Sequence, residues 1–330
     1  MENRKETYQC LLCKEPLSQN KINCRDLITN VEGQFTYVRC SSCGSYIQNP
    51  IPSFDFLAKC YSTQDLGYIR PPPEKKIVFS ILTYVTAGPE YVFNKILRNI
   101  SPLLNTIELK PTIPAPARIL EIGCSHGSRL LYLKNQGYEV KGIELSEESV
   151  RFAQEKGLDV ECTSLEMCSF PENSFDVVIM SMVLEHLRNP ASELSQICKW
   201  VKPGGDLLIS VPCADGFEFK RYMEFCYVVQ PPYHIFIPTI KGLQRLLEKD
   251  FNINCIAFQA FHRDLIASAK FKRQSVSDTT FWENILHIVA KSYSLKSLVR
   301  TVLLFYVLSG GVTSRVSLRC TKKQVKEMIT

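Results

Sequence analysis

The stretch RILEIGCSHG, residues 118–127, begins as a short apolar run and ends in an acid followed by Gly-Cys-Ser-His-Gly. An apolar run of this length next to glycines predicts a buried strand followed by a tight turn. Gly123 and Gly127 allow the backbone to come close to a ligand. In open α/β sheets, ligands bind at the carboxyl ends of the strands. The stretch therefore predicts a ligand-binding turn at such an end.

The residues that follow this turn alternate short apolar runs with helical stretches. Further strands are predicted at 138–145, 158–163, 175–182 and 206–212, and helices at 128–137, 146–157 and 191–205. The last of these helices is expected to end in its Lys-Pro-Gly-Gly sequence. Strands and helices that alternate at this spacing predict a parallel sheet covered on both faces.

Composition divides the 330 residues into four parts. They are a cysteine-rich module and linker at 1–73, a helical lead-in at 74–114, the α/β core at 115–262, and a basic region at 263–330 that holds helices and a last strand. The triproline at 71–73 marks the first boundary, because proline does not fit inside a helix. Residues 270–330 carry eleven basic and three acidic side chains, so the excess of positive charge in this chain of net charge +6 lies almost entirely there.

The fourteen cysteines stand in a long chain whose start has no secretory signal pattern. Reduced thiols and metal ligation are therefore expected in preference to disulfides. No apolar stretch reaches the roughly 18 residues that span a bilayer. A cytoplasmic protein without a transmembrane segment is predicted.

Two carboxylates narrow the class of ligand. Glu144 ends the next predicted strand, 21 residues after Gly123, where a carboxylate can accept hydrogen bonds from ribose hydroxyls. The turn lacks the G-x-G-x-x-G pattern of dinucleotide sites, and Glu121 would repel a pyrophosphate. A nucleoside with an uncharged or cationic substituent is therefore favoured.

Four segments in order resemble the successive motifs of class I S-adenosylmethionine-dependent methyltransferases. They are ILEIGCSHG (119–127), GIELS (142–146), SFDVVIMSMVLEHLRNP (174–190) and VKPGGDLLISVP (201–212). The resemblance covers about residues 115–262. It implies a Rossmann-like, mostly parallel sheet of seven strands with helices on both faces, and S-adenosylmethionine as the cofactor.

The resemblance also implies a set of cofactor-binding residues. The methionine part of the cofactor would lie among Glu121, Gly123, Cys124 and Gly127. Glu144 would bind the ribose. Ser164 and Leu165 would border the adenine, with Ser181 nearby. Two departures from the family pattern concern this set. Ser125 and Ser164 stand where many members have glycine and aspartate, although both serines can still form hydrogen bonds.

The amino-terminal part contains two C-x-x-C pairs separated by 26 residues, CLLC at 10–13 and CSSC at 40–43. Cys10, Cys13, Cys40 and Cys43 together match a tetrahedral zinc site. The alternatives are a disulfide or unrelated core cysteines. Four thiolates leave no open position on the metal, so a structural zinc is expected.

The run 35–68 resembles the zinc-binding amino-terminal region of some bacterial sugar and small-molecule methyltransferases. In those enzymes the tyrosine-rich segment that follows approaches the cofactor and substrate. The resemblance makes Tyr61 and Tyr68 candidates for the same position. Core packing is the alternative for both.

Transfer of an activated methyl group to a hydroxyl or an acidic carbon requires removal of a proton, for which histidine is suited near neutral pH. His186 follows the strand at 175–182, and His234 lies in PPYHIFIP after the strand at 206–212. Both are expected at the carboxyl edge of the sheet, as candidate catalytic bases. The alternative for His186 is a residue at a helix start that shapes the pocket.

The segment after the strand at 175–182 bears on the class of methyl acceptor. The chain has MSMVLEH, not the Asn/Asp-Pro-Pro-Tyr element typical of enzymes that methylate exocyclic amines, so an oxygen or carbon acceptor is favoured. A sugar, nucleotide-linked sugar, glycan or secondary metabolite is expected. Two alternatives stay open: a ribosomal RNA methyltransferase that uses the basic tail on phosphates, and a non-catalytic scaffold or S-adenosylmethionine sensor. Helices within 281–308 could pack a homodimer, with core packing as the default.

Overall fold

The computed structural model describes residues 8–62, 110–259, 261–276, 280–289 and 310–324, together with 299, 302, 303 and 306. The triproline boundary at 71–73, Tyr68 and all but the last five residues of the helical lead-in expected at 74–114 lie outside these residues.

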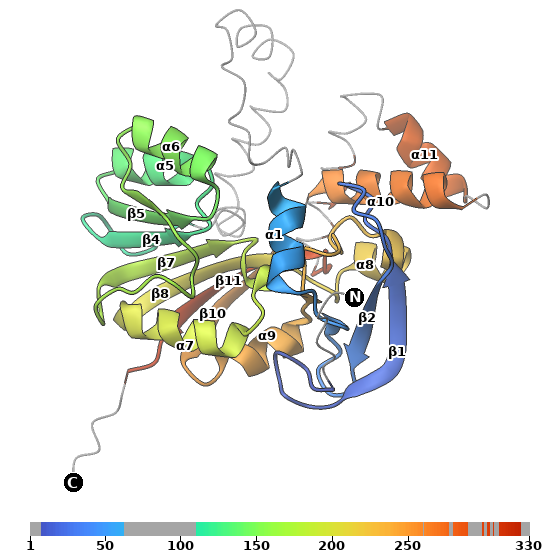
Figure 1. The fold of residues 1–330 in the computed structure, drawn as a ribbon, viewed down its shortest axis with the longest axis horizontal. Coiled ribbons are helices and arrows are strands. Elements are labelled where there is room, and N and C mark those ends of the chain that lie inside the picture. The colour runs from blue at the N-terminus through green and yellow to red at the C-terminus, as the bar shows by residue number, and fades with distance from the viewer. Residues whose placement is uncertain are drawn as a thin grey trace, which may run out of the picture.

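A seven-stranded sheet in the order β10-β11-β8-β7-β4-β5-β6 forms the centre of the molecule (Figure 1). Its strands in chain order are β4 (Arg118–Ile122), β5 (Glu139–Glu144), β6 (Val160–Cys162), β7 (Phe175–Ser181), β8 (Val201–Pro212), β10 (Phe251–Phe258) and β11 (Arg315–Lys322). β11 is antiparallel to β10 and β8, and the other pairs are parallel. The expected Rossmann-like, mostly parallel sheet is therefore confirmed.

Helices cover both faces of this sheet. Figure 1 shows α5 (Ser128–Asn135) and α6 (Glu147–Glu155) on one face, and α7 (Pro190–Trp200) and α9 (Ile240–Leu247) on the other. The middles of the central strands are largely apolar because both faces are covered. In β7, for example, residues 177–180 are 0% exposed. The core therefore fills the middle of the sheet, and polar side chains gather at the ends of the strands.

The predicted helix at 191–205 is too long by five residues. α7 ends at Trp200, and Val201–Gly205 belong to β8 instead. The residue before a proline is driven away from helical backbone, and Pro203 itself would break the helix. Gly205 then lies so close to β7 that a Cβ atom would be 2.8 Å from the carbonyl oxygen of Asp176.

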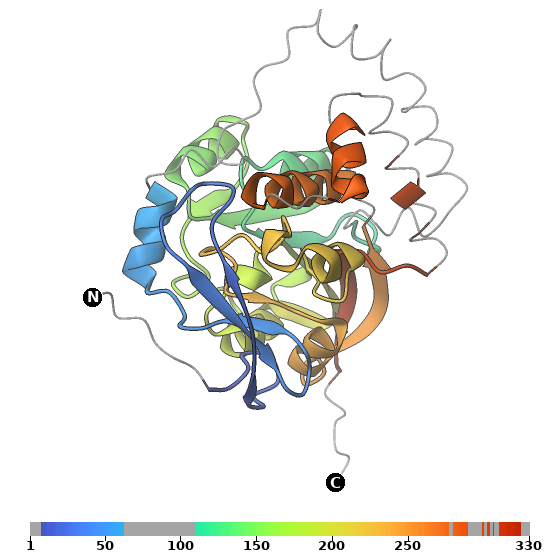
Figure 2. The same ribbon diagram turned by 90° about the vertical axis from the view of Figure 1, so that its right-hand side faces the viewer.

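A second, antiparallel sheet has the order β1-β2-β3-β9. Its strands are β1 (Leu17–Cys24), β2 (Phe35–Cys40), β3 (Tyr46–Gln48) and β9 (Phe236–Ile237). The short helix α1 (Phe54–Ser62) follows β3. The first three strands come from the amino-terminal module, whereas β9 comes from the stretch after His234. Figure 2 shows this sheet against the rest of the molecule, so the module shares its sheet with the chain's later part.

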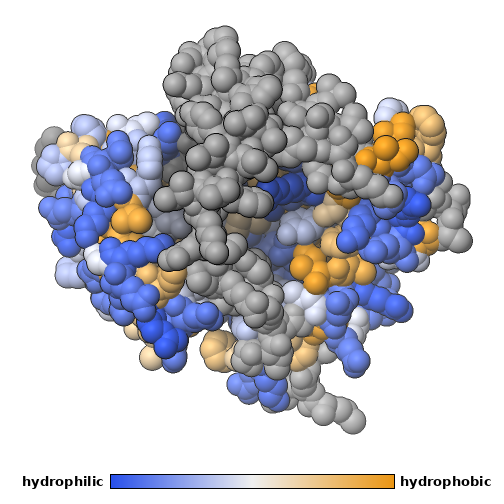
Figure 3. Space-filling model, turned by 90° about the horizontal axis from the view of Figure 1, so that it is seen from above, coloured by the Kyte–Doolittle hydropathy of each residue, from blue (hydrophilic) through white to orange (hydrophobic). Residues whose placement is uncertain are grey.

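The remaining described elements lie around the carboxyl end of β8 and in the last third of the chain. They are η1 (Leu184–His186), α8 (Phe217–Tyr222), η2 (Met223–Phe225), α10 (His262–Ser275) and α11 (Phe281–Val289). Apolar surface gathers on the α11 side of the molecule (Figure 3), and Phe281, Trp282 and Ile288 are exposed there. Among the described residues, no helix has the length and apolar character needed to cross a bilayer.

Candidate functional site

The turn at 123–127 connects β4 to α5 and requires glycine at both ends. Gly123 and Gly127 have φ values of 67° and 70°, which favour glycine. A Cβ atom would also lie 2.5 Å from Cγ2 of Val183 at position 123 and 2.4 Å from Cδ1 of Leu158 at position 127. The backbone of the turn is thus packed closely against its neighbours.

Glu144 lies at the end of β5 and orders the turn from the side. Its Oε2 accepts a hydrogen bond from the backbone N–H of Ser125 at 2.9 Å. Its Oε1 accepts from the N–H groups of Leu145 at 2.8 Å and Ser146 at 3.1 Å. Each carboxylate oxygen has two lone pairs, so Oε2 keeps one for a ligand. The carboxylate predicted to bind a ribose is therefore held at the carboxyl end of its strand.

Glu121 lies under the same turn, and only 3% of it is exposed. Its Oε1 forms an ion pair with Nη1 of Arg129 at 2.5 Å, whereas its Oε2 is buried without a hydrogen-bond partner among the described residues. Burial raises the pKa of this carboxyl to about 7, and Arg129 opposes that shift. A buried acceptor without a donor can bind a cationic or N–H group of a ligand.

Arg129 is a site residue that the sequence reasoning missed. It stands in the first turn of α5, and its Nη2 also lies 3.4 Å from the hydroxyl of Ser181 at the end of β7. The signal in the sequence is a cation eight residues after an acid, one turn into the next helix. This signal is weak by itself, because an arginine at a helix start is usually solvated.

The other predicted cofactor residues occupy the same edge of the sheet. Cys124 is buried in the turn, and Ser181 ends β7. Ser164 and Leu165 follow β6 in a turn in which the carbonyl oxygen of Ser164 accepts from Met167 and Cys168. β4, β5, β6 and β7 are adjacent and parallel, so these residues share one edge.

The two histidines predicted as bases are brought together. Their rings are 4.8 Å apart between centroids and nearly perpendicular. Nδ1 of His186 lies 3.0 Å from the carbonyl oxygen of Tyr233 and 3.1 Å from the hydroxyl of Tyr61. Nδ1 of His234 lies 2.8 Å from the carbonyl oxygen of Val228. Burial lowers the pKa of His186 to about 4 and that of His234 well below its usual value, so both rings are neutral at pH 7.

Glu185 is the third member of this group, and the sequence reasoning did not single it out. It is 0% exposed, and neither carboxylate oxygen has a hydrogen-bond partner among the described residues. Its Oε1 is 3.8 Å from Nε2 of His234. Burial raises the pKa of the Glu185 carboxyl to about 8. An acid directly before His186 was visible in LEHL, but its burial is a property of the fold.

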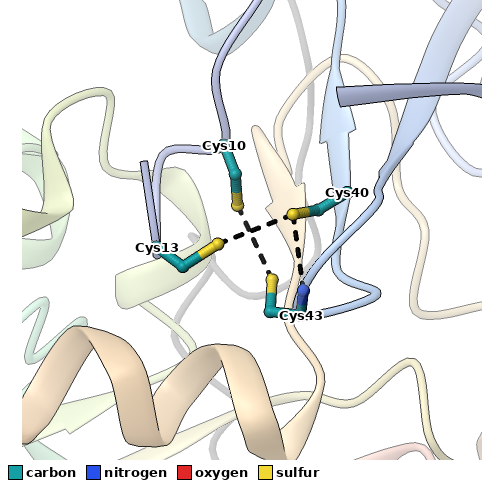
Figure 4. A group of neighbouring side chains, drawn as sticks. All are labelled: Cys10, Cys13, Cys40 and Cys43. Carbon is teal, nitrogen blue, oxygen red and sulfur yellow. Dashed lines mark hydrogen bonds between the residues drawn. The ribbon is translucent and has the colours of Figure 1, made fainter. Parts of the chain in front are cut away.

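The four predicted metal ligands converge near the amino terminus (Figure 4). Sγ of Cys10 lies 3.7 Å from Sγ of Cys43, and Sγ of Cys13 lies 3.5 Å from Sγ of Cys40. All four are free thiols, since a disulfide would require about 2.05 Å. Metal–sulfur bonds of about 2.3 Å in a tetrahedron place the sulfur atoms about 3.8 Å apart. The cluster therefore has the spacing of a tetrahedral metal site.

The amino-terminal module contacts the segment that carries His234. The hydroxyl of Tyr37 donates to the carbonyl oxygen of His234 at 2.7 Å, and the N–H of Gln48 donates to the carbonyl oxygen of Ile235 at 2.8 Å. Both residues belong to the sheet that begins beside the cysteine cluster. The position of His234 thus depends on the module as well as on the main sheet.

The sequence is similar to known methyltransferases. A family model described as a methyltransferase domain matches residues 90–257, just over half of the chain. Phosphoethanolamine N-methyltransferase 1 of Arabidopsis thaliana is 26% identical over 207 residues, which cover 58% of this chain and 41% of that protein. The ubiquinone biosynthesis O-methyltransferase of Hahella chejuensis is 34% identical over 124 residues, 35% of this chain and 52% of that protein.

Among solved structures, an S-adenosylmethionine dependent methyltransferase from Mesorhizobium loti aligns with a TM-score of 0.42 and 14% identity. The alignment covers 64% of this chain and 94% of that one. The chain spans about two fifths of the length of the phosphoethanolamine relatives it matches.

Proposed function

Because the chain belongs to the methyltransferase-domain family, we propose that it transfers a methyl group from S-adenosylmethionine to an oxygen or carbon atom of a small molecule. A sugar, a nucleotide-linked sugar, a glycan or a secondary metabolite is the expected acceptor. The observation that carries the proposal is the unpartnered Oε2 of Glu121 beneath the turn at 123–127. A buried carboxylate oxygen at this edge of a parallel sheet fits the cationic amino-acid end of that cofactor.

The residues present fit the cofactor. When bound, S-adenosylmethionine supplies a methyl group that is already activated on a sulfonium. We assign Oε2 of Glu121 to the ammonium group, and the guanidinium of Arg129, which already pairs with Glu121, to the carboxylate. Glu144 has lone pairs left for the ribose hydroxyls. Ser164 and Leu165 are assigned to the adenine.

The nature of the acceptor is supported by the segment after β7. This segment reads MVLEH at 182–186 and lacks the Asn/Asp-Pro-Pro-Tyr element, which favours oxygen or carbon over an exocyclic amine. A primary amine on a phosphorylated small molecule is the second candidate. It is favoured by the similarity to phosphoethanolamine N-methyltransferases. Removal of the acceptor's proton by His186 or His234 stays a prediction.

The cysteine cluster is assigned to a structural zinc ion. Thiolates are preferred by zinc, and the distances between the sulfur atoms match a ZnS₄ tetrahedron. Four protein ligands complete the coordination, so the ion would hold the module together without taking part in methyl transfer. Cys10, Cys40 and Cys43 are buried, which fits a closed site.

Calorimetric titration tests the proposal first. S-adenosylmethionine and its demethylated product should bind the wild-type protein, and Glu121→Ala should weaken both, because the ammonium loses its partner. Absence of binding to the wild type would favour the non-catalytic scaffold and contradict the proposal. An unchanged affinity in Glu121→Ala would contradict the assigned orientation.

Acceptor panels then separate the candidate substrates. Formation of S-adenosylhomocysteine is measured with sugars and nucleotide sugars, with phenolic metabolites, with phosphoethanolamine, and with ribosomal RNA. Turnover with a hydroxyl or carbon acceptor supports the proposal. Turnover confined to phosphoethanolamine supports the second candidate, and turnover confined to RNA would support the RNA methyltransferase.

A further inference from the structure

Three side chains that belong neither to the cysteine cluster nor to the turn at 123–127 converge. Glu185 and His186 belong to η1, and His234 precedes β9. The N–H of Ile235 donates to the backbone carbonyl oxygen of Glu185 at 2.7 Å, which joins the two segments. Each of the three side chains offers one ligand atom within 4.8 Å of the others. We refer to them as the Glu185–His186–His234 cluster.

Glu185 lacks the donors that a buried carboxylate normally has. Both of its oxygens are buried without a hydrogen-bond partner among the described residues. Arg315, whose charge acts on Glu185, gives Nε and Nη2 to Asp264. A buried carboxylate without donors costs several kcal/mol unless a cation or proton compensates it. The cluster therefore needs a positive partner that these side chains do not supply.

The hydrogen bonds of the two imidazoles fix where their lone pairs lie. A carbonyl oxygen can only accept, so Nδ1 of His234 carries a hydrogen for Val228 and its Nε2 keeps a lone pair. That Nε2 faces Oε1 of Glu185 at 3.8 Å. Nδ1 of His186 likewise donates to the carbonyl oxygen of Tyr233, which leaves its Nε2 as an acceptor. The hydroxyl of Tyr61 adapts to either role.

We propose that Glu185, His186 and His234 bind a divalent transition-metal ion. A single proton could form a hydrogen bond between Glu185 and one ring. It would leave Nε2 of the second ring and the other carboxylate oxygen without a hydrogen-bond partner. Two neutral imidazoles and one carboxylate are a ligand set that Zn²⁺, Fe²⁺ and Co²⁺ accept. Metal ligation by both rings would use the lone pairs that remain.

The spacing between Glu185 and His234 is close to that of a bound site, and the other ligand atoms lie within 4.8 Å. Bonds of about 2.1 Å in a tetrahedron place ligand atoms about 3.4 Å apart, so the 3.8 Å between Glu185 and His234 needs only a small contraction. Each imidazole already donates its other N–H to a backbone carbonyl, the arrangement usual for metal-bound histidine. Three protein ligands leave the metal a further position for water or a substrate oxygen.

The inference does not rest on methyl transfer, and it excludes the role of base predicted from the sequence. A ring that ligates through Nε2 and donates through Nδ1 has no lone pair for a proton. The hydroxyl of an acceptor bound to the metal would instead be acidified by the ion. Metal binding and proton removal by these rings are therefore alternatives that one measurement separates.

The test counts metal ions in the full-length protein. Wild type is equilibrated by dialysis with Zn²⁺ or with Co²⁺, and the bound metal is measured by atomic emission. Glu185→Gln removes the charge at nearly constant volume, and His234→Asn removes the ring. Glu193→Gln is the matched control, because Glu193 is also buried with an unpartnered oxygen but lies outside the cluster. His262→Asn, at the start of α10, controls for the loss of a histidine.

Wild type and both controls should bind one equivalent more than Glu185→Gln and His234→Asn. With Co²⁺, the additional equivalent should add no sulfur-to-metal charge-transfer absorption, which separates it from the cysteine cluster. Circular dichroism and binding of S-adenosylhomocysteine check that each variant is folded. If one of the two cluster variants does not fold, His186→Asn is used in its place. Equal metal content in wild type and all folded cluster variants would overturn the proposal, as would a sulfur charge-transfer band for the additional equivalent.

Discussion

The hydroxyl of Thr239 donates a hydrogen bond to the backbone carbonyl oxygen of Cys43 over 2.6 Å. The same hydroxyl caps α9 by accepting from the N–H of Gly242 at 3.0 Å. One side chain therefore connects the second cysteine pair to a helix that packs on the main sheet. Together with the pairing of β3 and β9, this bond makes the amino-terminal module continuous with the core.

Thr239→Val should destabilise the whole chain. The substitution removes a helix cap worth about 1 kcal/mol and a buried hydrogen bond worth about 1 kcal/mol. A loss of about 2 kcal/mol in the free energy of unfolding is expected from urea titration. Thr36→Val is the control, because its hydroxyl bonds Asn23 at the surface and should cost less than about 0.5 kcal/mol. Equal effects of the two substitutions would contradict the coupling.

Removal of metal from the cysteine cluster should unfold more than the module. The cluster holds the turn at 40–43, which directly precedes β3, and β3 is paired with β9 beside His234. A strong chelator should therefore lower the thermal midpoint of the full chain in one transition. Cys43→Ser should act in the same direction, whereas Cys162→Ser, an exposed cysteine, should not. A separate low-temperature transition that leaves the main sheet intact would show that the module folds independently.

Binding of S-adenosylmethionine should strengthen as pH rises through about 7. The pKa of Glu121 is raised to about 7 by burial, so below that pH the carboxyl must release a proton before it can pair with an ammonium. The dissociation constant should rise by up to about tenfold for each pH unit below 7. Glu121→Gln should lose this dependence, and Glu193→Gln, whose carboxyl pKa is also raised to about 7, should retain it. Titration calorimetry from pH 5.5 to 8 measures the slope.

The same carboxyl should have the opposite effect on folding without the cofactor. Its pKa is about 7 in the folded protein and 4.5 as the ordinary value, so the folded state holds the proton more tightly. Its stabilising contribution is thus present below about pH 4.5 and is lost as pH rises to about 7. Glu121→Gln should flatten the fall of the free energy of unfolding across this window. An unchanged slope in urea titrations would show that folding does not raise the pKa of Glu121.

Gly123→Ala should impair both folding and cofactor binding. A Cβ atom at this positive φ costs about 1 kcal/mol, and its approach to Val183 adds about 1 to 3 kcal/mol of overpacking. Adding Val183→Ala to this variant should recover the free energy lost to overpacking, whereas the loss from the strained backbone should remain. Urea titration of the single and double variants measures the two terms. A double variant no more stable than Gly123→Ala would show that Val183 is not the source of the strain.

Sequence patterns determined the strand-and-helix order and the family. The four motif segments imply a fold and a cofactor because each one covers all or the end of β4, β5, β7 or β8, and these four strands are neighbours in the sheet. The two C-x-x-C pairs predicted the cysteine cluster because each pair lies on one tight turn, which is a local property. The predicted end of α7 was wrong because the apolar periodicity continues beyond Trp200, whereas Pro203 does not allow the helix to continue.

Tertiary structure alone decided which distant groups meet and how deeply they are buried. Arg129 pairs with Glu121 because a helix start is folded back over the strand before it. Glu185 meets His234 because the chain after β8 passes from the main sheet to the amino-terminal sheet, which it joins through β9. Burial, and with it the change in proton affinity, depends on every element packed around a group. A local sequence pattern does not contain that information.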